Sequence, residues 1–259
     1  MRVSQLLPSV RVEVEKPFQE KLTKARQLVR IWANRNACVS CSFGKDSTVV
    51  LYLVREVNPS IPVIFNNTGV EFKETLEFKD QLKREWDLNL IELKPEKTFW
   101  QIMNPKKMKI PDGQKSVKHR FDARHTHDAC CYYLKEKPFK DYVKGRFSVN
   151  FTGITAMESR QRMLRACEKG MEYYHKTHDL LKVHPILYWT PEEVWRFIGE
   201  KGIPVNPAYQ KYTLDRIGCV PCTSHRGWRE QLAKVNPKMY RFVQKRFFGQ
   251  ELLEAYIYV

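Results

Sequence analysis

The sequence predicts an α/β protein built on a doubly wound parallel sheet. Its first hundred residues alternate short apolar runs with amphipathic stretches, an order typical of parallel strands joined by helical crossovers. The apolar runs have the length of buried strands, and the stretches between them repeat apolar residues at three- and four-residue steps. A chain of 259 residues with 42% hydrophobic residues suits one large domain, or a domain with a small appendage. This composition excludes collagen-like, low-complexity and disordered proteins.

The elements follow from the local pattern. A first helix is expected over residues 18–34, where Leu22, Leu28 and Trp32 share one face. A helix that starts at Thr190 has Pro191 at its first position and acidic residues in its first turn, which are favourable there. Strands are expected at residues 37–42, 61–65, 88–93, 147–154 and 181–183, and the other helices over residues 48–58, 71–86 and 237–248.

Three regions are expected along the chain. Residues 1–36 form a helical lead-in, and residues 37–200 form the α/β domain. Residues 94–145 interrupt that domain as a basic insertion of loops and short helices, because they combine four prolines with many lysines and arginines. Residues 201–259 form a C-terminal region with two cysteines and a helix.

The charge predicts an anionic partner. The sequence has 45 Lys and Arg against 29 Asp and Glu, a net charge of +16 with a pI near 9.5. Such an excess favours DNA, RNA or an anionic substrate, although a merely basic surface remains the alternative. No apolar run is long enough to span a membrane, and the N-terminal residues lack the apolar core of a secretory leader. A cytoplasmic protein with no membrane partner is therefore expected.

A short polar segment between a predicted strand and a predicted helix can bind phosphate. It runs from Ser42 to Ser47 with the sequence Ser-Phe-Gly-Lys-Asp-Ser. Backbone N–H groups at a helix N-terminus favour an anion, Gly44 permits close approach, and Lys45 adds a positive charge. The spacing is not that of a Walker A loop. An ordinary helix start, capped by Ser42 or Asp46, is the competing interpretation.

This segment resembles the PP-loop of the ATP pyrophosphatases, which split ATP between its α- and β-phosphates. The run Asn67-Thr68-Gly69, and Gly153 with the later Arg162, resemble two further motifs of the PAPS reductase family. The resemblance implies an adenine nucleotide alpha hydrolase-like fold, with ATP and Mg²⁺ as cofactors and Lys45, Asp46 and Ser47 as catalytic residues. The implied ATP-binding residues are Ser42, Phe43, Gly44, Lys45, Asp46, Ser47, Asn67, Thr68, Gly69, Gly153 and Arg162.

Three positions depart from the family pattern. Phe43 stands where the PP-loop has a glycine, and Asn67 stands where the family has an aspartate. Thr155 replaces an arginine that lies in the substrate-binding strand of the reductases. The nucleotide contacts are therefore expected to differ from those of a reductase.

Four of the seven cysteines have the spacing of a metal or cluster site. They are Cys130, Cys131, Cys219 and Cys222. Four thiolates suit Zn²⁺ or an iron–sulfur cluster, but an adjacent pair fits the usual zinc knuckles poorly. The arrangement resembles the [4Fe-4S] site of APS reductases, which implies such a cluster here; zinc and plain thiols remain alternatives.

The other candidate groups have simpler interpretations. Cys38 and Cys41 are expected to be small buried residues of the first strand, and Cys167 to be core or incidental surface. Trp189 and Trp195 are expected to pack in the core. For His119, His125 and His127, anion binding or a solvated face is favoured over a metal site.

The resemblance leads to one main functional hypothesis and two alternatives. The main hypothesis is an ATP pyrophosphatase with a cluster that activates a substrate by adenylation for sulfur transfer, such as phosphorothioation of DNA or thiolation of another nucleic acid. Expected partners are a nucleic acid bound through residues 106–140, a sulfur donor such as a cysteine desulfurase, and a second copy of the chain. Related reductases carry a catalytic cysteine near the C-terminus, and no cysteine follows Cys222 here. A divergent sulfonucleotide reductase is the first alternative, and a binding module without activity is the second.

Overall fold

The structure is a computed structural model, and it describes residues 1–102, 130–222 and 227–247. Within it the chain forms two compact units, and each unit collects several separate stretches of the sequence. Unit 1 comprises Met1–Phe65, Glu74–Leu93 and Lys140–Pro207, and unit 2 comprises Asn66–Lys73, Lys94–Phe139 and Ala208–Val259.

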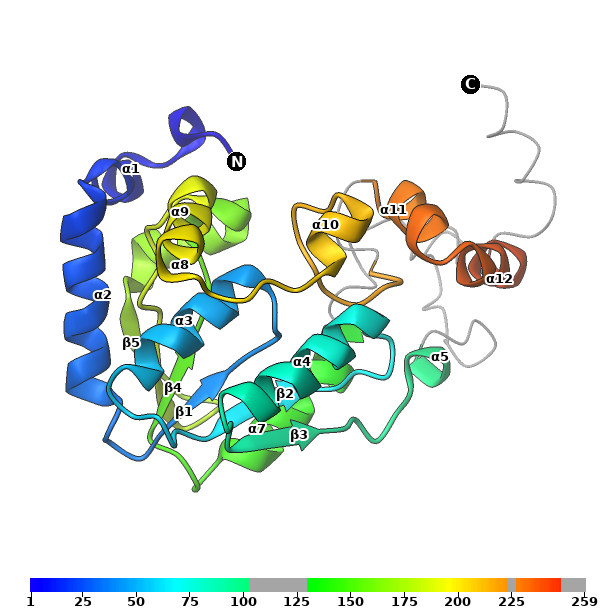
Figure 1. The fold of residues 1–259 in the computed structure, drawn as a ribbon, viewed down its shortest axis with the longest axis horizontal. Helices are drawn as coiled ribbons and strands as arrows, with labels where there is room; N and C mark the ends of the chain where they lie inside the picture. Colours follow the sequence, from blue (N-terminus) through cyan, green and yellow to red (C-terminus); the bar gives the residue numbers. More distant parts are fainter. Residues whose placement is uncertain (103–129, 223–226, 248–259) are drawn as a thin grey trace, which may run out of the picture. The chain divides into compact units, whose positions relative to one another are not determined.

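Unit 1 is built on a six-stranded sheet of order β3-β2-β1-β4-β6-β5 (Figure 1). Strand β1 pairs in parallel with β2 on one side and with β4 on the other, and β4 pairs in parallel with β6. The predicted α/β fold with a largely parallel sheet is confirmed. The strands are β1 (Ala37–Ser40), β2 (Val63–Asn66), β3 (Leu90–Leu93), β4 (Val149–Thr152), β5 (Glu172–His175) and β6 (Leu180–Val183).

Four helices of unit 1, α2, α3, α4 and α9, were predicted, whereas α1 and α8 were not. Helix α9 begins as expected, because the Thr190 side chain accepts a hydrogen bond from the N–H of Glu193 and Pro191 occupies the first turn. Helix α3 contacts β1 and crosses in front of it in Figure 1. The helices are α1 (Pro8–Glu15), α2 (Phe18–Trp32), α3 (Lys45–Arg55), α4 (Lys73–Glu85), α8 (Arg160–Lys169) and α9 (Pro191–Lys201); short 3-10 turns lie at Val3–Gln5 and Ala156–Glu158.

The sheet departs from the predicted all-parallel arrangement at one edge. Strand β5 runs antiparallel to β6, and the turn between them is only four residues long. A turn this short can join antiparallel strands, whereas parallel strands need a much longer crossover. The sequence pattern missed β5 because an edge strand of four residues, half of them exposed, has no apolar run.

The main core of unit 1 lies around this sheet. It includes Phe43, Phe65, Phe151, Trp189 and Phe197, all of which are almost fully buried. Trp189 packs edge-on against Phe197, so its predicted place in the core is confirmed. The same prediction is wrong for Trp195, which is 39% exposed. Trp195 lies near the start of the amphipathic helix α9. The buried positions of this helix are Val194, Phe197 and Ile198, and Trp195 is not one of them.

Unit 2 is mostly helical and has its own apolar core. Buried residues from every stretch of the unit contribute to it, among them Phe72, Phe99, Leu134, Val220 and Trp228. The described elements are α5 (Phe99–Ile102), a π-helical turn (Tyr132–Glu136), α10 (Ala208–Tyr212), α11 (Trp228–Val235) and α12 (Pro237–Phe247). Helix α7 (Lys137–Val143) carries the chain from unit 2 back to unit 1.

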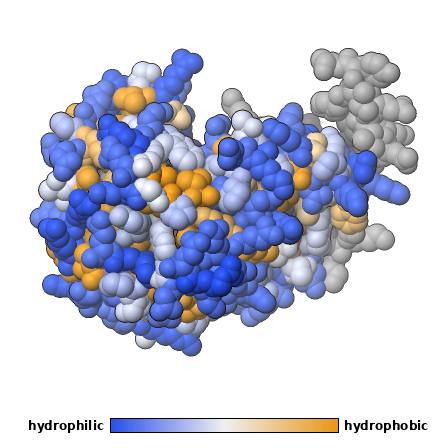
Figure 2. Space-filling view, in the orientation of Figure 1, coloured by the Kyte–Doolittle hydropathy of each residue, from blue (hydrophilic) through white to orange (hydrophobic). Residues whose placement is uncertain are grey.

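The surface of unit 1 that faces the viewer in Figure 2 is mostly hydrophilic, with hydrophobic residues scattered among the charged ones. Among the helices that the structure describes, none is both long enough and apolar enough to cross a membrane.

Candidate functional site

The predicted phosphate loop lies at the carboxyl end of β1. Residues 42–44 connect β1 to α3, and β1 has β2 on one side and β4 on the other. The chain continues from β1 to β2 on one side of the sheet, and β4 begins the other side, so the strand order reverses between β1 and β4. Ligands of open α/β sheets bind outside the carboxyl ends of the strands at such a point. The loop therefore occupies the position where this fold binds ligands.

Phe43 shows how the loop tolerates its departure from the glycine of the family pattern. Its φ of 56° lies in the left-handed region, where glycine is the least strained residue. The ring is fully buried and packs against Phe65 and Phe78, at centroid distances of 5.5 Å and 6.4 Å. Burial of the ring thus offsets the backbone strain. The side chain of Phe43 belongs to the core, so only its backbone can face a nucleotide.

Asn206 stabilises the loop from the protein interior, and no sequence pattern singled it out. Its amide donates a hydrogen bond of 3.2 Å to the carbonyl of Phe43 and another of 2.9 Å to the hydroxyl of Thr75. Asn206 is only 1% exposed, so these bonds form away from water. The residue follows α9 in a loop, where an asparagine before a proline resembles any turn residue.

The hydroxyl of Ser47 ties the two ends of the loop together. Its Oγ accepts a hydrogen bond from the N–H of Ser42 at 3.2 Å and donates one to the carbonyl of Gly44 at 3.0 Å. Thr48 donates a second hydroxyl bond to the same carbonyl at 3.0 Å. The hydroxyl of Ser47 therefore stabilises the conformation of the loop.

The start of α3 is available to an anion. Gly44 occupies the N-cap position, and no side chain caps the helix, so neither Ser42 nor Asp46 does so. The first N–H groups of a helix have no partner within the helix, and they carry its positive dipole end. These donors, together with the glycine before them, fit a phosphate group.

Lys45 and Asp46 form an ion pair at this helix start. The ammonium of Lys45 lies 2.8 Å from each carboxylate oxygen of Asp46, and both side chains are largely buried. Hydrogen bonds that Glu192 accepts from its own N–H and from Thr190 are the main causes that lower the pKa of Glu192. The positive charge of Lys45 lowers this pKa further. Glu192 lies in the first turn of α9. Sequence reasoning assigned it only a helix-dipole role.

Gly153 lies directly against the loop. A Cβ atom added to it would come within 2.5 Å of the N of Ser47 and 2.7 Å of the carbonyl oxygen of Asp46. No side chain fits there without moving the backbone. The structure thus brings Gly153 to the loop, where its role is to permit close packing of the turn after β4 against the start of α3.

Thr155 and Arg162 lie on the segment after Gly153. Thr155 is 3% exposed and caps the turn Ala156–Glu158: its own N–H donates to the Glu158 carboxylate at 3.2 Å. Arg162, in α8, forms an ion pair with Glu158. Its predicted role in nucleotide binding stays a prediction.

The other predicted nucleotide-binding residues, Asn67 to Gly69, belong to unit 2. The side-chain oxygen Oδ1 of Asn67 accepts a hydrogen bond from the N–H of Gly69, which closes a tight turn with Gly69 at a φ of 76°. The buried Thr68 hydroxyl donates to Glu71 at 2.7 Å and lies 3.5 Å from the sulfur of Cys219. Within unit 2, these residues therefore contact the cysteine site.

The four cysteines selected from the sequence are brought together in unit 2. Burial, followed by the negative charges that Cys219, Cys131 and Cys222 carry when ionised, raises the pKa of Cys130 to about 12. Burial likewise raises the pKa of Cys219 to about 11, although Lys135 opposes this effect. All four cysteines belong to unit 2, and Cys130 and Cys219 both pack against its apolar core. None of the seven cysteines of the chain is in a disulfide.

Lys135 is the cation of this site. The charge of an ionised Cys219 is the largest influence that raises the pKa of Lys135, and Glu71, Cys131 and Cys222 add to it against the cost of burial. Lys135 lies on the π-helical turn that begins directly after the cysteine pair. Such turns occur mostly at functional sites.

Among residues 1–102, 130–222 and 227–247, no three His, Cys, Asp or Glu side chains lie close enough together to hold a metal ion. The positive charge of Lys135 could offset the negative charge of ionised cysteines in this unit.

A family model confirms the relationship that the motifs indicated. The model of the phosphoadenosine phosphosulfate reductase domain matches residues 36–225, which include the loop and all four cysteines of the site. The chain belongs to the phosphoadenosine phosphosulfate reductase family.

Family relatives cover most of the chain. It is 30% identical over 210 residues to an adenosine 5'-phosphosulfate reductase of Staphylococcus epidermidis, a match that covers 78% of each protein. An uncharacterized protein of Methanocaldococcus jannaschii is 29% identical over 214 residues, which cover 81% of this chain and 47% of that protein.

Solved structures share the fold. A phosphoadenylyl-sulfate reductase from Candida auris has a TM-score of 0.52 at 19% identity, and covers 80% of this chain and 89% of its own. A tRNA thiolase from Methanococcus maripaludis, solved with its [4Fe-4S] cluster, has a TM-score of 0.50 at 14% identity, and covers 93% of this chain and 80% of its own. At these identities the likeness concerns the fold alone.

The remaining cysteines of this family member have simpler surroundings. Cys38 and Cys41 are buried, as predicted, and burial raises the pKa of both thiols, that of Cys41 to about 11. The sulfur of Cys41 lies 3.7 Å from the hydroxyl of Ser47. Cys167 is exposed on α8, which agrees with one of its two predicted locations, an incidental position on the surface. The histidines His119, His125 and His127, and most of the basic segment 106–140, lie outside the described residues.

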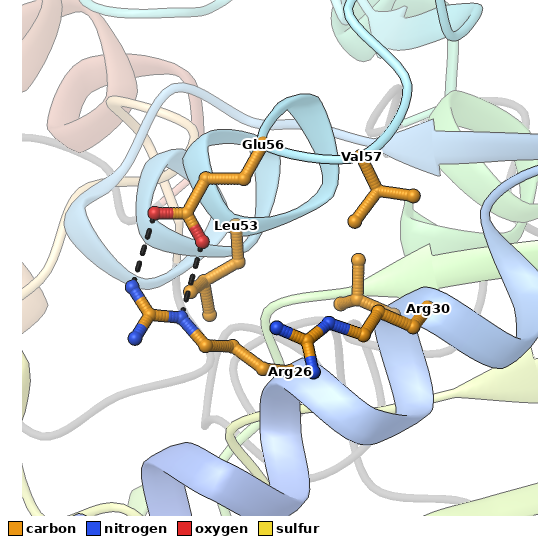
Figure 3. A pocket seen from close by; sticks show the side chains of 6 residues that line it. Arg26, Arg30, Leu53, Glu56 and Val57 are labelled. Carbon is orange, nitrogen blue, oxygen red and sulfur yellow. Dashed lines mark hydrogen bonds and ion pairs between the residues drawn. The ribbon is translucent and has the colours of Figure 1, made fainter.

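A pocket of about 270 Å³ in unit 1 lies away from the phosphate loop (Figure 3). Its lining comes from α2 and from the C-terminal part of α3, and Arg26 forms two hydrogen bonds with Glu56 across it. The length of α3, roughly 15 Å, separates this pocket from the loop. We therefore do not include the pocket in the candidate site.

Proposed function

We propose that this chain is an ATP pyrophosphatase that activates its substrate by adenylation for sulfur transfer. ATP would bind at the Ser42–Ser47 loop with Mg²⁺. An oxygen of the substrate would attack the α-phosphorus of ATP. This attack forms the bond between the substrate and AMP, and it breaks the bond between the α-phosphorus and pyrophosphate. A sulfur atom of the donor would then displace AMP from the activated substrate. Where that sulfur arrives as a persulfide, a second thiol would attack the disulfide bond so formed, which leaves one sulfur on the substrate and a disulfide between the two thiols.

One observation carries this proposal: the start of α3 has no capping side chain and lies at the carboxyl end of the central strand. Its N–H groups can hold phosphate oxygens, and Lys45 can stabilise the charge that develops on them. Asp46 supplies a carboxylate for Mg²⁺ and keeps Lys45 in place through the ion pair. Ser47 and Gly153 keep the loop in the shape that exposes these donors.

The cysteine site supports the sulfur-transfer part of the proposal. We assign Cys130, Cys131, Cys219 and Cys222 as ligands of a [4Fe-4S] cluster, which would supply iron–sulfur chemistry when bound. The chain itself provides Lys135, whose charge would offset that of the four thiolates. Thr68 and Glu71 would orient the thiol of Cys219 through the contacts that they make with it.

A reductase is the second candidate function, because the relatives that share about 30% of the sequence are named adenosine 5'-phosphosulfate reductases. The surroundings of Thr155 favour the first candidate. In the reductases an arginine of the substrate-binding strand occupies this position, whereas here a buried threonine caps a helical turn. A threonine at this position has no positive charge with which to offset the sulfate or phosphate charge of a sulfonucleotide.

The acceptor that we propose is a nucleic acid. A net charge of +16 favours a polyanion, because each neutralised phosphate releases counterions. The thiolase that shares the fold acts on tRNA and carries a cluster, which is consistent with such an acceptor. We further propose a cysteine desulfurase as the sulfur donor. Charge reversal at Lys107, Lys115 and Lys118 together should weaken nucleic-acid binding if the basic segment takes part.

Product analysis tests the ATP chemistry. The protein, purified without oxygen, should convert ATP to AMP and pyrophosphate in the presence of Mg²⁺ and an acceptor. Lys45→Ala should lower the rate by about 10²–10³-fold, the usual loss when one such donor is removed. Lys24→Ala, an exposed change on α2, should leave the rate unchanged. Formation of ADP, or full activity of Lys45→Ala, would refute the assignment.

Iron analysis and a sulfite assay separate the two candidates. The protein should bind about four irons per chain, and Cys130→Ser or Cys219→Ser should remove the visible absorbance. Cys167→Ser, which changes an exposed thiol on α8, is the matched control and should retain it. Release of sulfite from adenylyl sulfate at enzymatic rates would establish the reductase instead.

A further inference from the structure

One face of the sheet of unit 1 is polar where it approaches the edge strand β5. Asn150 of β4, Lys182 of β6 and Tyr173 of β5 are register partners, so their side chains form one row on the same face. The alternate residues Phe151 and Val183 point to the other face and belong to the main core. Parallel strands are usually apolar on both faces, because helices cover both. A polar and charged row therefore needs a reason other than core packing.

Rings and cations extend this row into one surface, which we call the β5–β6 face. It comprises Tyr173, His175, Lys182 and His184, together with Lys169 of α8. The ring of Tyr173 lies 5.6 Å from that of His184 and 6.3 Å from that of His175, measured between centroids. The ammonium of Lys169 lies 4.9 Å from the centroid of the Tyr173 ring. These distances and the register of Lys182 bring two cations and three rings together within unit 1.

Helix α8 adds another cation. Arg165 lies four residues before Lys169, so the two share one side of the helix, and both are exposed. Burial is the main cause that lowers the pKa of His175 to about 4, and the charges of Lys182, Lys169 and Arg165 contribute to the same shift. The imidazole of His175 is therefore uncharged at neutral pH, and three cations act on it.

The acidic residues of this region do not offset these cations. Residues 160–184 contain six lysines and arginines but three acidic residues. Glu172 accepts a hydrogen bond of 2.9 Å from the indole of Trp32, and Asp179 accepts one from the hydroxyl of Tyr174. Both donors are uncharged. Within the part of the chain that the structure describes, the two cations that α8 contributes form no ion pair with an acidic side chain. The β5–β6 face is thus a site of uncompensated positive charge.

His175 adds an uncharged hydrogen-bond donor. Its Nδ1 accepts a hydrogen bond of 3.2 Å from the N–H of His178, and the two rings stack with their centroids 4.1 Å apart. The single proton of the neutral imidazole is therefore on Nε2, from which it can be donated to an anion. The guanidinium of Arg165 has the fork geometry that binds phosphate oxygens in pairs. Both kinds of donor suit a phosphate.

The β5–β6 face begins beside the candidate nucleotide site. Strands β1, β4 and β6 are parallel, so their carboxyl ends lie at the same edge of the sheet. There the hydroxyl of Thr152, at the end of β4, lies 2.6 Å from Nδ1 of His184, which follows β6. The next residue, Gly153, packs against the backbone of Ser47 in the loop. An extended ligand that follows the face toward these strand ends therefore arrives at the loop.

We propose that the β5–β6 face, with Arg165, binds the phosphodiester backbone of the nucleic-acid acceptor and leads it to the Ser42–Ser47 loop. This inference rests on the proposed function for the identity of the partner, and it adds a second surface to the basic segment 106–140. The cations lie on two elements, α8 and β6, and those of α8 are separated by roughly 6 Å along the helix. Such a spread suits consecutive phosphates of one strand.

Fluorescence anisotropy with a labelled single-stranded RNA of twelve nucleotides tests the proposal on the full-length protein. Arg165→Ala and Lys169→Ala together should lower the slope of log affinity against log salt by about 1.4, since each phosphate contact on a single strand contributes about 0.7. Near 0.1 M salt the same change should weaken binding by about tenfold or more. Lys83→Ala with Arg84→Ala removes the same charge from exposed positions of α4, and this matched control should change both quantities much less.

A second variant tests the uncharged donor. His175→Phe keeps a ring for the stack on His178 but removes the Nε2–H group, and it should weaken binding by about tenfold, as expected for one hydrogen bond to a charged group. Its melting temperature, measured beside that of the unmodified protein, shows that the variant is folded under the conditions of the assay.

Three results would overturn the proposal. The first is a loss of affinity in the α8 variant no larger than in the α4 control, and the second is an unchanged salt slope. The third is displacement of the RNA by inorganic phosphate at equal ionic strength, because the face would then hold one anion and not a strand. Formation of AMP by the unmodified protein is measured separately. Its absence would refute the proposed function, whereas anisotropy needs no ATP and would still detect RNA bound on this face.

Discussion

Replacing Gly153 by alanine tests the central geometry of the nucleotide site. The added Cβ would lie 2.5 Å from the N of Ser47, whereas ordinary contacts begin at about 3.4 Å. The turn after β4 and the start of α3 must therefore separate by about 0.9 Å. The neighbouring atoms are backbone, so no flexible side chain can move away to relieve the contact.

This displacement should affect both stability and activity. Overpacking of a close-packed interior costs about 1–3 kcal/mol, which in a domain of this size lowers the melting temperature by about 2–12 °C. A shift of nearly 1 Å in the N–H groups that hold phosphate should lower the rate of ATP cleavage by up to about 10²-fold. Calorimetry and a pyrophosphate assay at a temperature where both proteins are folded measure the two effects separately.

Gly199 provides the matched control. It lies within α9, and a Cβ atom added there would meet nothing within 4 Å. Gly199→Ala should therefore raise the stability by up to about 1 kcal/mol, because alanine favours a helix more than glycine does. If Gly153→Ala melts at the wild-type temperature and cleaves ATP at the wild-type rate, the close packing of Gly153 against the loop is not what shapes the site.

Two further predictions concern buried polar residues. Asn206→Ala should destabilise the protein by about 1–3 kcal/mol in urea unfolding, because it leaves the buried carbonyl of Phe43 without its donor; the exposed change Asn89→Ala should cost little, and equal losses would contradict this reasoning. Burial, and then Lys182, lower the pKa of His184 to about 3, so its contribution to stability is complete above pH 6.5 and is lost as the pH falls toward 3. His184→Gln should reduce the pH dependence of the free energy of unfolding between pH 6 and 4 by about 1.4 kcal/mol per pH unit, and an unchanged slope would exclude this role.

Local patterns predicted much of unit 1. The cap at Thr190 and the proline after it located the start of α9, and the polar loop between two apolar runs located the turn before α3. Both features depend on residues close together in the sequence. The predicted start of α3, at Thr48, was three residues late, because Lys45 to Ser47 are polar residues that form its first turn.

The surroundings of the site could not be predicted in the same way. Asn206 supports Phe43 across 163 residues of sequence, and Thr68 contacts Cys219 across 151. No periodicity connects such positions, and the resemblance to a family assigned Thr68 to the nucleotide instead. Burial of the Phe43 ring was equally hidden, because a phenylalanine in a polar loop has no local reason to point into the core.

The division of unit 2 into separate stretches has a consequence for how the protein is made. Cys130 and Cys131 leave the ribosome long before Cys219 and Cys222, since 87 residues lie between the two pairs. At about 5–20 residues per second, that interval lasts roughly 4–17 s. During this time the first pair of thiols, with Lys135 beside it, exists without its partners. An iron–sulfur group held by both pairs can therefore be inserted only after synthesis has passed Cys222, and the adjacent thiols must stay reduced until then.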